Sequence, residues 1–316
     1  MKRALILLFL ILSLSQSDLL AVTETELDSL WIRASSGGIR FRDEVQPAKD
    51  ALVEHGEEAV DYLVDKMDTR GAREMHTLVD ILGKIGSPAV DEVCGQLNSD
   101  DFYRVRLATR VLGRIGDSTA VDCLLPHAGS PEYNIRSGVA SALGKIGHSS
   151  AVETLKELSR DEDYLVRKSA VVALGKMPFD KVKEQLILCL SDDYYGVRYS
   201  AGRAFAGYED GGAEESAEYL KDYVDEFLDK KEPFSDIETL AVTHAIETLG
   251  TMEYKDARGL FKDIIKSDRT SIIRGYAVRG LGKVGKESDF RMISKLVKYE
   301  PDYFVKSMML NMVKNH

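Results

Sequence analysis

The sequence lacks the residue clusters on which most enzymes and metal proteins depend. Of its six histidines, none is directly followed by glutamate, and His244 with Glu247 is an i, i+3 pair on its own. A metal site needs more converging ligands than one such pair provides. The chain also has no glycine-rich phosphate loop, no nucleophile elbow and no convincing catalytic triad. The sequence therefore predicts no catalytic residue, no metal site and no cofactor.

Cysteine is scarce, with only Cys94, Cys123 and Cys189 in 316 residues. An odd number at these spacings fits no zinc-binding pattern. We interpret all three as small buried residues in the second helices of repeats. An oxidising compartment would allow one disulfide, but the sequence does not fix which two cysteines pair.

Basic residues are outnumbered, with 42 Lys and Arg against 52 Asp and Glu and a net charge of −10. Such an acidic chain repels the phosphate backbone, so nucleic acid is excluded as a partner.

Long apolar runs are missing except at the start, where Ala4 to Leu14 is apolar apart from Ser13. The run follows Lys2 and Arg3 and precedes small residues, and it is too short to cross a bilayer. Residues 1–17 are therefore predicted to be a signal peptide, and the protein to be exported to the periplasm or the extracellular space. No later stretch is apolar enough to span a membrane. Cleavage after Ser17 would remove Lys2 and Arg3 and leave 40 basic against 52 acidic residues, a net charge of −12.

What the chain does contain is a repeated Leu-Gly dipeptide. It occurs at Leu82-Gly83, Leu112-Gly113, Leu143-Gly144, Leu174-Gly175, Leu249-Gly250 and Leu281-Gly282. Phe205 and Met312 continue the spacing of about 31 residues, whereas the step from Phe205 to Leu249 is 44. A regular period of this length indicates a repeat architecture.

One repeat, residues 161–191, shows why the period is about 31. Asp161 and Asp163 are candidate N-caps, and apolar residues at helical spacing then lead to Leu174. A second apolar stripe follows after Pro178. In most repeats a glycine at the matching position is expected to end the first helix in the left-handed conformation, namely Gly86, Gly116, Gly147 and Gly285. Two antiparallel helices of this size bury their apolar faces only by stacking on neighbours.

The predicted fold is all-α, a right-handed α-solenoid of the armadillo/HEAT kind with about eight helix pairs and a terminal half repeat. We expect a capping helix within residues 18–40, in which Trp31 shields the first repeat. Repeats follow over residues 41–207 and 237–316. Residues 208–236 contain the extra 13 residues of the long step and are expected to form an extended acidic helix and loop within a repeat.

The segment Tyr164-Leu-Val-Arg-Lys-Ser-Ala-Val-Val-Ala-Leu-Gly-Lys176 resembles the short bacterial HEAT-like repeat, also called the phycobilin-lyase repeat. The resemblance covers nearly all of residues 41–316. It implies the solenoid fold but no single function, because the family includes scaffolds, bilin lyases, a metal-dependent hydroxylase and base-excision glycosylases. The hydroxylases use several His-Glu dipeptides as iron ligands and the glycosylases need a basic concave surface, and this chain has neither.

Tyrosine and a basic residue recur three apart at the start of the first helices. The pairs are Tyr103 with Arg106, Tyr133 with Arg136, Tyr164 with Arg167, Tyr195 with Arg198, and Tyr303 with Lys306. The resemblance implies that most of the arginines bridge neighbouring repeats. The tyrosine rings either pack between repeats or form, with the arginines, a Tyr/Arg ridge that binds a partner.

The second candidate surface is an acidic edge within residues 208–236, a segment of 11 acidic and 3 basic residues. Its members are Glu214, Glu215, Glu218, Asp222, Asp225 and Glu226. No calcium-loop spacing is present, so we interpret this edge as a solvated face rather than a cation site.

The primary functional hypothesis is a non-catalytic protein-binding or scaffold module of the bacterial periplasm or cell envelope. Its protein partner is not identified by the sequence, and its oligomeric state is open. The alternative is an enzyme, such as a lyase, with its site in the concave groove. A third hypothesis is a subunit of an assembly that buries the second-helix face.

Overall fold

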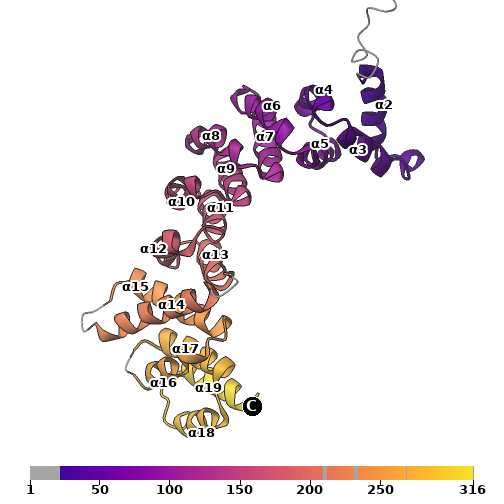
Figure 1. The fold of residues 1–316 in the computed structure, drawn as a ribbon. Helices are drawn as coiled ribbons and strands as arrows, with labels where there is room; N and C mark the ends of the chain where they lie inside the picture. Colours follow the sequence, from indigo (N-terminus) through magenta and orange to yellow (C-terminus); the bar gives the residue numbers. More distant parts are fainter. Residues whose placement is uncertain (1–21, 209–211, 231–233, 268, 316) are drawn as a thin grey trace, which may run out of the picture. The chain divides into compact units, whose positions relative to one another are not determined.

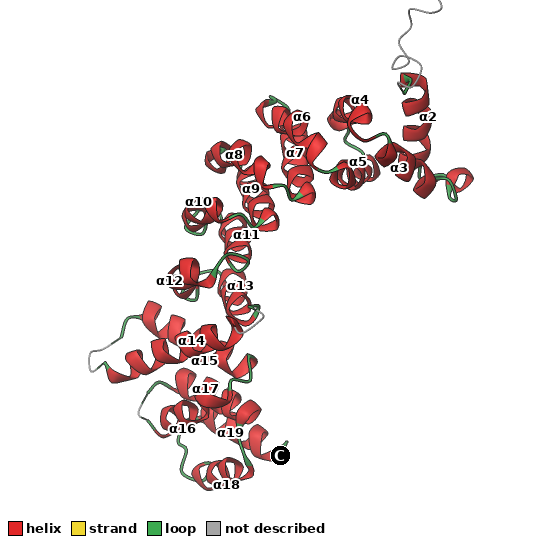
Figure 2. Cartoon of the chain, in the orientation of Figure 1, coloured by secondary structure: helices red, strands yellow, loops and turns green. Residues whose placement is uncertain are grey.

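The computed structural model describes residues 22–208, 212–230, 234–267 and 269–315. The predicted signal peptide lies outside these residues. Within them the chain forms 18 α-helices, α2 to α19, joined in part by short 3-10 turns, and contains no β-strand (Figures 1 and 2).

The helices follow one another as eight pairs, with α2 (Glu24–Ser35) in front and α19 (Tyr303–Lys314) behind. The first helices are α3 (Val45–Glu54), α5 (Ala72–Ile85), α7 (Phe102–Ile115), α9 (Tyr133–Ile146), α11 (Tyr164–Leu174), α13 (Tyr195–Ala206), α15 (Asp236–Thr251) and α17 (Ser271–Val284). The second helices are α4 (Val60–Asp65), α6 (Val90–Gly95), α8 (Val121–Leu124), α10 (Val152–Leu158), α12 (Phe179–Cys189), α14 (Gly212–Asp229), α16 (Arg258–Lys266) and α18 (Glu287–Leu296). The 3-10 turns are η1 (Ile39–Phe41), η2 (Gly56–Ala59), η3 (Lys66–Asp68), η4 (Ser87–Ala89), η5 (Gln96–Asn98), η6 (Ser118–Ala120), η7 (Leu125–Gly129), η8 (Ser149–Ala151) and η9 (Lys255–Ala257). For the described residues, the prediction of eight pairs and a half repeat is confirmed.

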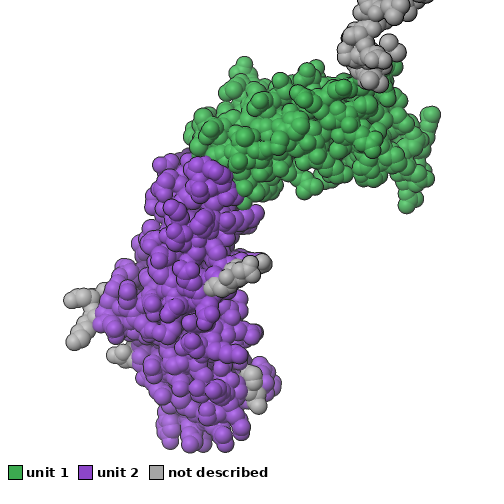
Figure 3. All heavy atoms as spheres, in the orientation of Figure 1, with its two compact units in different colours: residues 1–146 green, residues 147–316 purple. Residues whose placement is uncertain are grey.

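The chain divides into two compact units, residues 1–146 and 147–316 (Figure 3). In the first unit, α3, α5, α7 and α9 pack side by side as one layer, and α4 and α6 belong to the other. In the second unit, α11, α13, α15, α17 and α19 form the first-helix layer, and α10, α12 and α14 pack in succession behind it. The helix α2 packs on α3 and buries Trp31.

Side-chain caps and glycines set the helix ends. The carboxylates of Asp101 and Asp163 accept hydrogen bonds from backbone N–H groups at the starts of α7 and α11, which would otherwise have no partner. Gly116 ends α7 with a φ of 75°, in the left-handed region that favours glycine. Gly86 and Gly147 also have positive φ. The same expectation for Gly285 was wrong: its φ is −68°, and it ends α17 in an extended conformation.

The Leu-Gly dipeptide is the point at which neighbouring first helices meet. The leucines are fully buried, as at Leu112 and Leu143. A Cβ atom added to Gly113 would lie 2.8 Å from the Cα atom of Ala142, which shows that α7 and α9 approach almost backbone to backbone. The dipeptide therefore serves the packing of the repeats.

Replacing Gly113 with alanine is expected to lower the free energy of unfolding by about 1–3 kcal/mol, because the backbones must separate to admit the methyl group. Gly95 provides a matched control: it lies in α6 with α-helical φ and ψ, and a Cβ atom there would meet nothing within 4 Å. Gly95→Ala should stabilise by up to about 1 kcal/mol, since alanine favours helix. Urea unfolding of both variants measures the difference. Equal effects of the two substitutions would contradict the close approach at Gly113.

The three cysteines divide into a pair and a single thiol. Cys94 in α6 and Cys123 in α8 form a disulfide with their Cα atoms 5.9 Å apart, so it links two successive second helices. Cys189 in α12 is a free thiol, and burial raises its pKa to about 11. A thiol with this pKa stays protonated and unreactive at neutral pH.

Candidate functional site

Three of the four arginines of the predicted ridge, Arg136, Arg167 and Arg198, are hydrogen-bonded within the fold. Arg167 donates from Nε to Asp192 Oδ2 at 2.7 Å and from Nη2 to Asp192 Oδ1 at 3.0 Å. Its Nη1 donates to the backbone carbonyls of Asp161 and Glu162 at 3.0 and 3.1 Å. Arg167 thus connects the loop before its own helix to the loop before the next first helix, as the family resemblance implies.

Other arginines at the matching position make similar bonds to the preceding loop. Arg136 is buried and donates to the carbonyls of Ser130 and Pro131. Arg198 donates to the carbonyls of Asp192 and Asp193. These guanidinium groups are therefore structural, which leaves the tyrosines as the exposed part of the ridge.

The tyrosine rings lie at the surface. The exposed fractions are 40% for Tyr133, 42% for Tyr164 and 57% for Tyr195. In the second unit, Tyr164 packs against Tyr194 with ring centroids 4.2 Å apart, and Tyr195 stacks on Tyr199 at 6.1 Å. We call these four residues, Tyr164, Tyr194, Tyr195 and Tyr199, the tyrosine face.

Tyr103 and Arg106 are placed differently from the other pairs. Counted from the Leu-Gly dipeptides, Tyr133, Tyr164 and Tyr195 precede their anchor residue by ten, but Tyr103 precedes Leu112 by nine. Phe102 takes the matching position in α7, and Arg106 lies over both the Phe102 and Tyr103 rings. Tyr303, 86% exposed, is shifted in the same way relative to Met312. The regular ladder is therefore limited to the starts of α9, α11 and α13.

A hollow of about 100 Å³ adjoins the tyrosine face between α13 and α15. Tyr195, Tyr199 and Arg203 line it from α13, and His244, Glu247 and Thr248 from α15. In the sequence, His244 and Glu247 stand out only as an i, i+3 pair that is too small for a metal site. Tyr199 follows Tyr195 by one helical turn, and this i, i+4 spacing was the available signal.

Hydrogen bonds to both ring nitrogens indicate the tautomer of His244. Arg198 Nε donates to His244 Nε2 at 2.9 Å, so Nε2 is an acceptor and carries no proton. The proton is therefore on Nδ1, which lies 3.1 Å from Glu247 Oε2 and donates to it. With both nitrogens occupied and the side chain only 9% exposed, His244 has no nitrogen free to take a proton from a substrate.

Glu247 is held as a carboxylate. The hydrogen bond from His244 lowers its pKa despite partial burial, and the Arg279 guanidinium adds to the effect. Burial and the nearby Glu247 charge raise the pKa of Tyr276 on α17. The hollow thus presents the Glu247 carboxylate, an imidazole with both nitrogens hydrogen-bonded, and the phenols of Tyr195 and Tyr199, which suits hydrogen bonding and stacking better than proton transfer.

The acidic edge lies on α14, the longest helix described. Its inner stripe, Ala217, Leu220, Val224 and Phe227, is buried. Glu214, Glu215, Glu218, Asp222 and Glu226 lie on its outer side, while Asp225 pairs with Lys221 at 2.7 Å. No group of three or more His, Cys, Asp or Glu side chains among the described residues could hold a metal ion.

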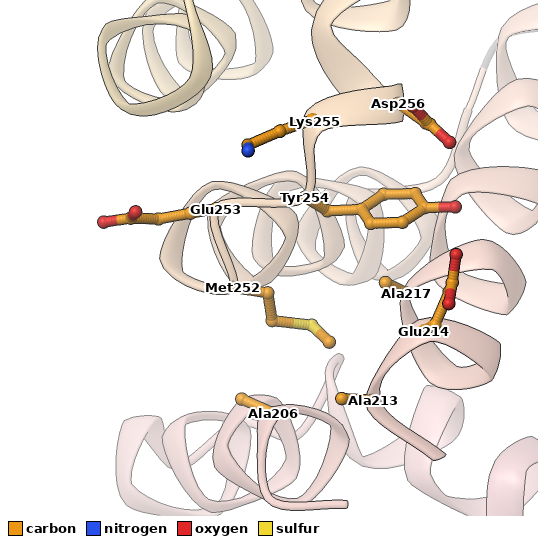
Figure 4. A pocket seen from close by; sticks show the side chains of 9 residues that line it. All are labelled: Ala206, Ala213, Glu214, Ala217, Met252, Glu253, Tyr254, Lys255 and Asp256. Atoms are coloured by element: carbon orange, nitrogen blue, oxygen red, sulfur yellow. The ribbon is translucent and has the colours of Figure 1, made fainter. Parts of the chain in front are cut away.

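Another hollow, of about 480 Å³, opens beside the start of α14 (Figure 4). Ala213, Glu214 and Ala217 face Met252 and Tyr254 of the turn after α15 across it. Burial raises the pKa of Tyr254, and nearby carboxylates including Asp256 and Glu214 raise it further. This hollow is wide and open, and its side chains form no catalytic grouping.

None of the helices in the described parts of the chain combines the length and the apolar character that crossing a bilayer requires.

Comparison with known proteins identifies the repeat. Residues 91–167 match a family model described as HEAT repeats. Importin beta shares the fold with a TM-score of 0.55 at 10% identity, over 90% of this chain and 46% of importin beta. The fold is a HEAT-type α-solenoid.

Two other solved structures are similar to this chain with lower TM-scores. The CpcE–CpcF complex of phycocyanin lyase from Nostoc matches 46% of this chain and 97% of its own, at 22% identity and a TM-score of 0.43. Human deoxyhypusine hydroxylase in complex with glycerol matches 85% of this chain and 100% of its own, at 16% identity and a TM-score of 0.36. This chain spans about half the length of importin beta. No curated protein matches the chain significantly.

Proposed function

We propose that the protein is a non-catalytic protein-binding module exported to the periplasm or cell envelope. The observation that carries the proposal is the tyrosine face of the second unit, where four exposed rings pack in pairs. Tyrosine provides a large, rigid contact area with a polar end, and it is enriched among the residues that dominate protein interfaces.

The chemistry of the adjoining hollow supports binding over catalysis. The imidazole of His244 is held between Arg198 and Glu247, and neither of its nitrogens faces the hollow with a free lone pair. General acid–base catalysis needs a group that can exchange a proton with the substrate. The hydrogen bonds instead hold the side chains of Arg198, His244 and Glu247 in place beside Tyr195 and Tyr199.

The Cys94–Cys123 disulfide supports the proposed location. Disulfides persist in oxidising compartments such as the periplasm and are rare in the reducing cytosol. The apolar N-terminal run in the sequence points in the same direction.

Site-specific photo-crosslinking in the native envelope tests this function. A photoreactive phenylalanine analogue replaces Tyr199, which is 52% exposed on the tyrosine face. The matched control places the analogue at Leu188, which is 58% exposed on the second helix α12. We expect a discrete adduct from position 199 and none from position 188. When the analogue replaces Tyr164 instead, we expect the additional substitution Tyr195→Ala to reduce the yield of the adduct formed from position 164. Equal labelling from both positions, or none from either, would refute a partner at the tyrosine face.

A further inference from the structure

Three hollows follow one another along the first-helix layer of the second unit. The hollow between α13 and α15 shares Glu247 and Thr251 with a second hollow between α15 and α17. The second shares Arg279 and Lys283 with a third between α17 and α19. Because neighbouring hollows share lining side chains, they lie next to one another in a row, and we call this row of hollows the first-helix groove.

The charge of the first-helix groove is opposite to that of the chain. Four cationic side chains line it, Arg198, Arg203, Arg279 and Lys283, against the single carboxylate of Glu247. The whole chain carries an excess of acids, 52 against 42. The groove therefore carries a local excess of positive charge on a chain that is acidic overall.

Three of the cations, Arg203, Arg279 and Lys283, keep exposed surface for a ligand. Arg198 is bound to His244 and backbone carbonyls, and Arg279 lies 3.5 Å from Glu247 but remains 56% exposed. Neither Arg203 nor Lys283, both exposed, has an ion-pair partner among the residues that the structure describes. They lie at separate hollows, Arg203 on α13 and Lys283 on α17, so a ligand that reaches both must be extended.

Apolar and aromatic surfaces alternate with these charges. Tyr195 and Tyr199 line the first hollow, Tyr276 the second, and Met308 and Met312 the third. Methionine adapts its shape to varied apolar side chains, and tyrosine stacks on apolar and aromatic ones. A ligand with both carboxylates and apolar side chains would complement the cations and the apolar surfaces along the whole groove.

We infer that the first-helix groove binds an extended acidic peptide segment of a partner protein, with Arg203, Arg279 and Lys283 contacting its carboxylates. The inference rests on the proposed protein-binding function and specifies the chemistry of the partner. Charge complementarity determines which partners are accepted, since like charges facing each other repel and opposite charges steer association.

Peptide binding to the full chain tests the inference. The probe is a short fluorescein-labelled peptide in which Glu alternates with Ala, Leu and Phe, and matched probes carry Gln or Lys in place of Glu. Fluorescence anisotropy should show binding of the Glu peptide that weakens as salt is added, because salt screens exposed charges. The Gln peptide should bind at least about tenfold more weakly and the Lys peptide not at all.

Two charge-reversal variants separate the groove from general electrostatics. Arg203→Glu with Arg279→Glu and Lys283→Glu should reduce binding of the Glu peptide at least about tenfold. The control, Lys181→Glu with Lys266→Glu and Lys295→Glu, makes the same change in net charge at exposed lysines on the second helices α12, α16 and α18, and should leave binding unchanged. Circular dichroism and the melting temperature establish that both variants fold.

Each alternative result overturns the inference in a recognisable way. An acidic ligand would be rejected if binding did not depend on the charge of the peptide, if the Glu peptide did not bind, or if both variants lost the same affinity for it. A dimer in sedimentation that the groove variant alone abolishes would identify the occupant as the acidic edge of a second copy instead. If crosslinking from Tyr199 captures a partner while the Glu peptide fails, the proposed function stands and only the acidic ligand is rejected.

Discussion

Arg167→Ala is expected to lower the free energy of unfolding by about 2–4 kcal/mol, a large effect for a single side chain. The substitution removes two hydrogen bonds to Asp192 and two to backbone carbonyls. It also leaves Asp192, whose side chain is only 10% exposed, without its counter-charge. Truncating one partner of a buried pair costs more than the pair itself contributes, because the remaining charge stays desolvated. Urea unfolding measures the loss.

Two controls define the cause of that loss. Asp193→Asn alters a carboxylate that also contacts Arg167 but is 88% exposed, and it should change stability by less than about 1 kcal/mol. Arg167→Lys keeps the charge but loses the planar guanidinium that donates two parallel hydrogen bonds, so the free energy of unfolding of this variant should lie between those of wild type and Arg167→Ala. If Asp193→Asn destabilised as much as Arg167→Ala, the buried pair would not be the source.

The effect of Arg167→Ala should depend on pH in a defined direction. Burial alone would raise the pKa of Asp192, but hydrogen bonds from Arg167 and from the Tyr194 backbone outweigh it, and the pKa lies below its usual value. A carboxyl group with a lowered pKa stabilises the fold above its unfolded-state pKa, and this contribution is lost as the pH falls through the folded-state pKa. The difference between wild type and Arg167→Ala should therefore narrow below about pH 4.

Reducing the Cys94–Cys123 disulfide is expected to destabilise the first unit by about 3 kcal/mol. The bond closes a loop with a sequence separation of 29, and opening it restores conformational freedom to the unfolded chain. Unfolding with and without dithiothreitol measures the loss, and Cys94→Ser with Cys123→Ser should reproduce it without reductant.

Cys189 provides the control for this prediction. Its thiol is buried, so Cys189→Ala should leave the sensitivity to reductant unchanged. Intact-mass measurement after alkylation of the unfolded protein should find one free thiol. Three free thiols in protein from the native compartment would reject the disulfide.

The repeat architecture was predictable because it is encoded locally. Leucine at a fixed period, followed by glycine, specifies where two first helices pack, and Gly113 against Ala142 realises this contact. Gly285 departs from the expected pattern because α17 ends without a left-handed residue. A glycine permits positive φ but does not impose it.

The candidate site was less predictable because it depends on register and on contacts across repeats. Tyr103 fits the Tyr/Arg spacing but is one residue out of register with Tyr133, which is a helical rotation of about 100°. The contact between Arg198 and His244 joins residues 46 apart across the long step, where the regular period gives no alignment.

The glycine contacts between first helices also set how closely the first helices of the second unit pack. A Cβ atom added to Gly175 would lie 2.7 Å from the Cβ atom of Ala204, and one added to Gly250 would lie 2.8 Å from the Cα atom of Gly280. Gly259 in the second helix α16 has open space around it. The tight contacts at Gly175 and Gly250 resist any closer approach of the first helices. The groove and the tyrosine face lie on these first helices, so the glycines set the smallest spacing at which a bound partner can meet successive contact points.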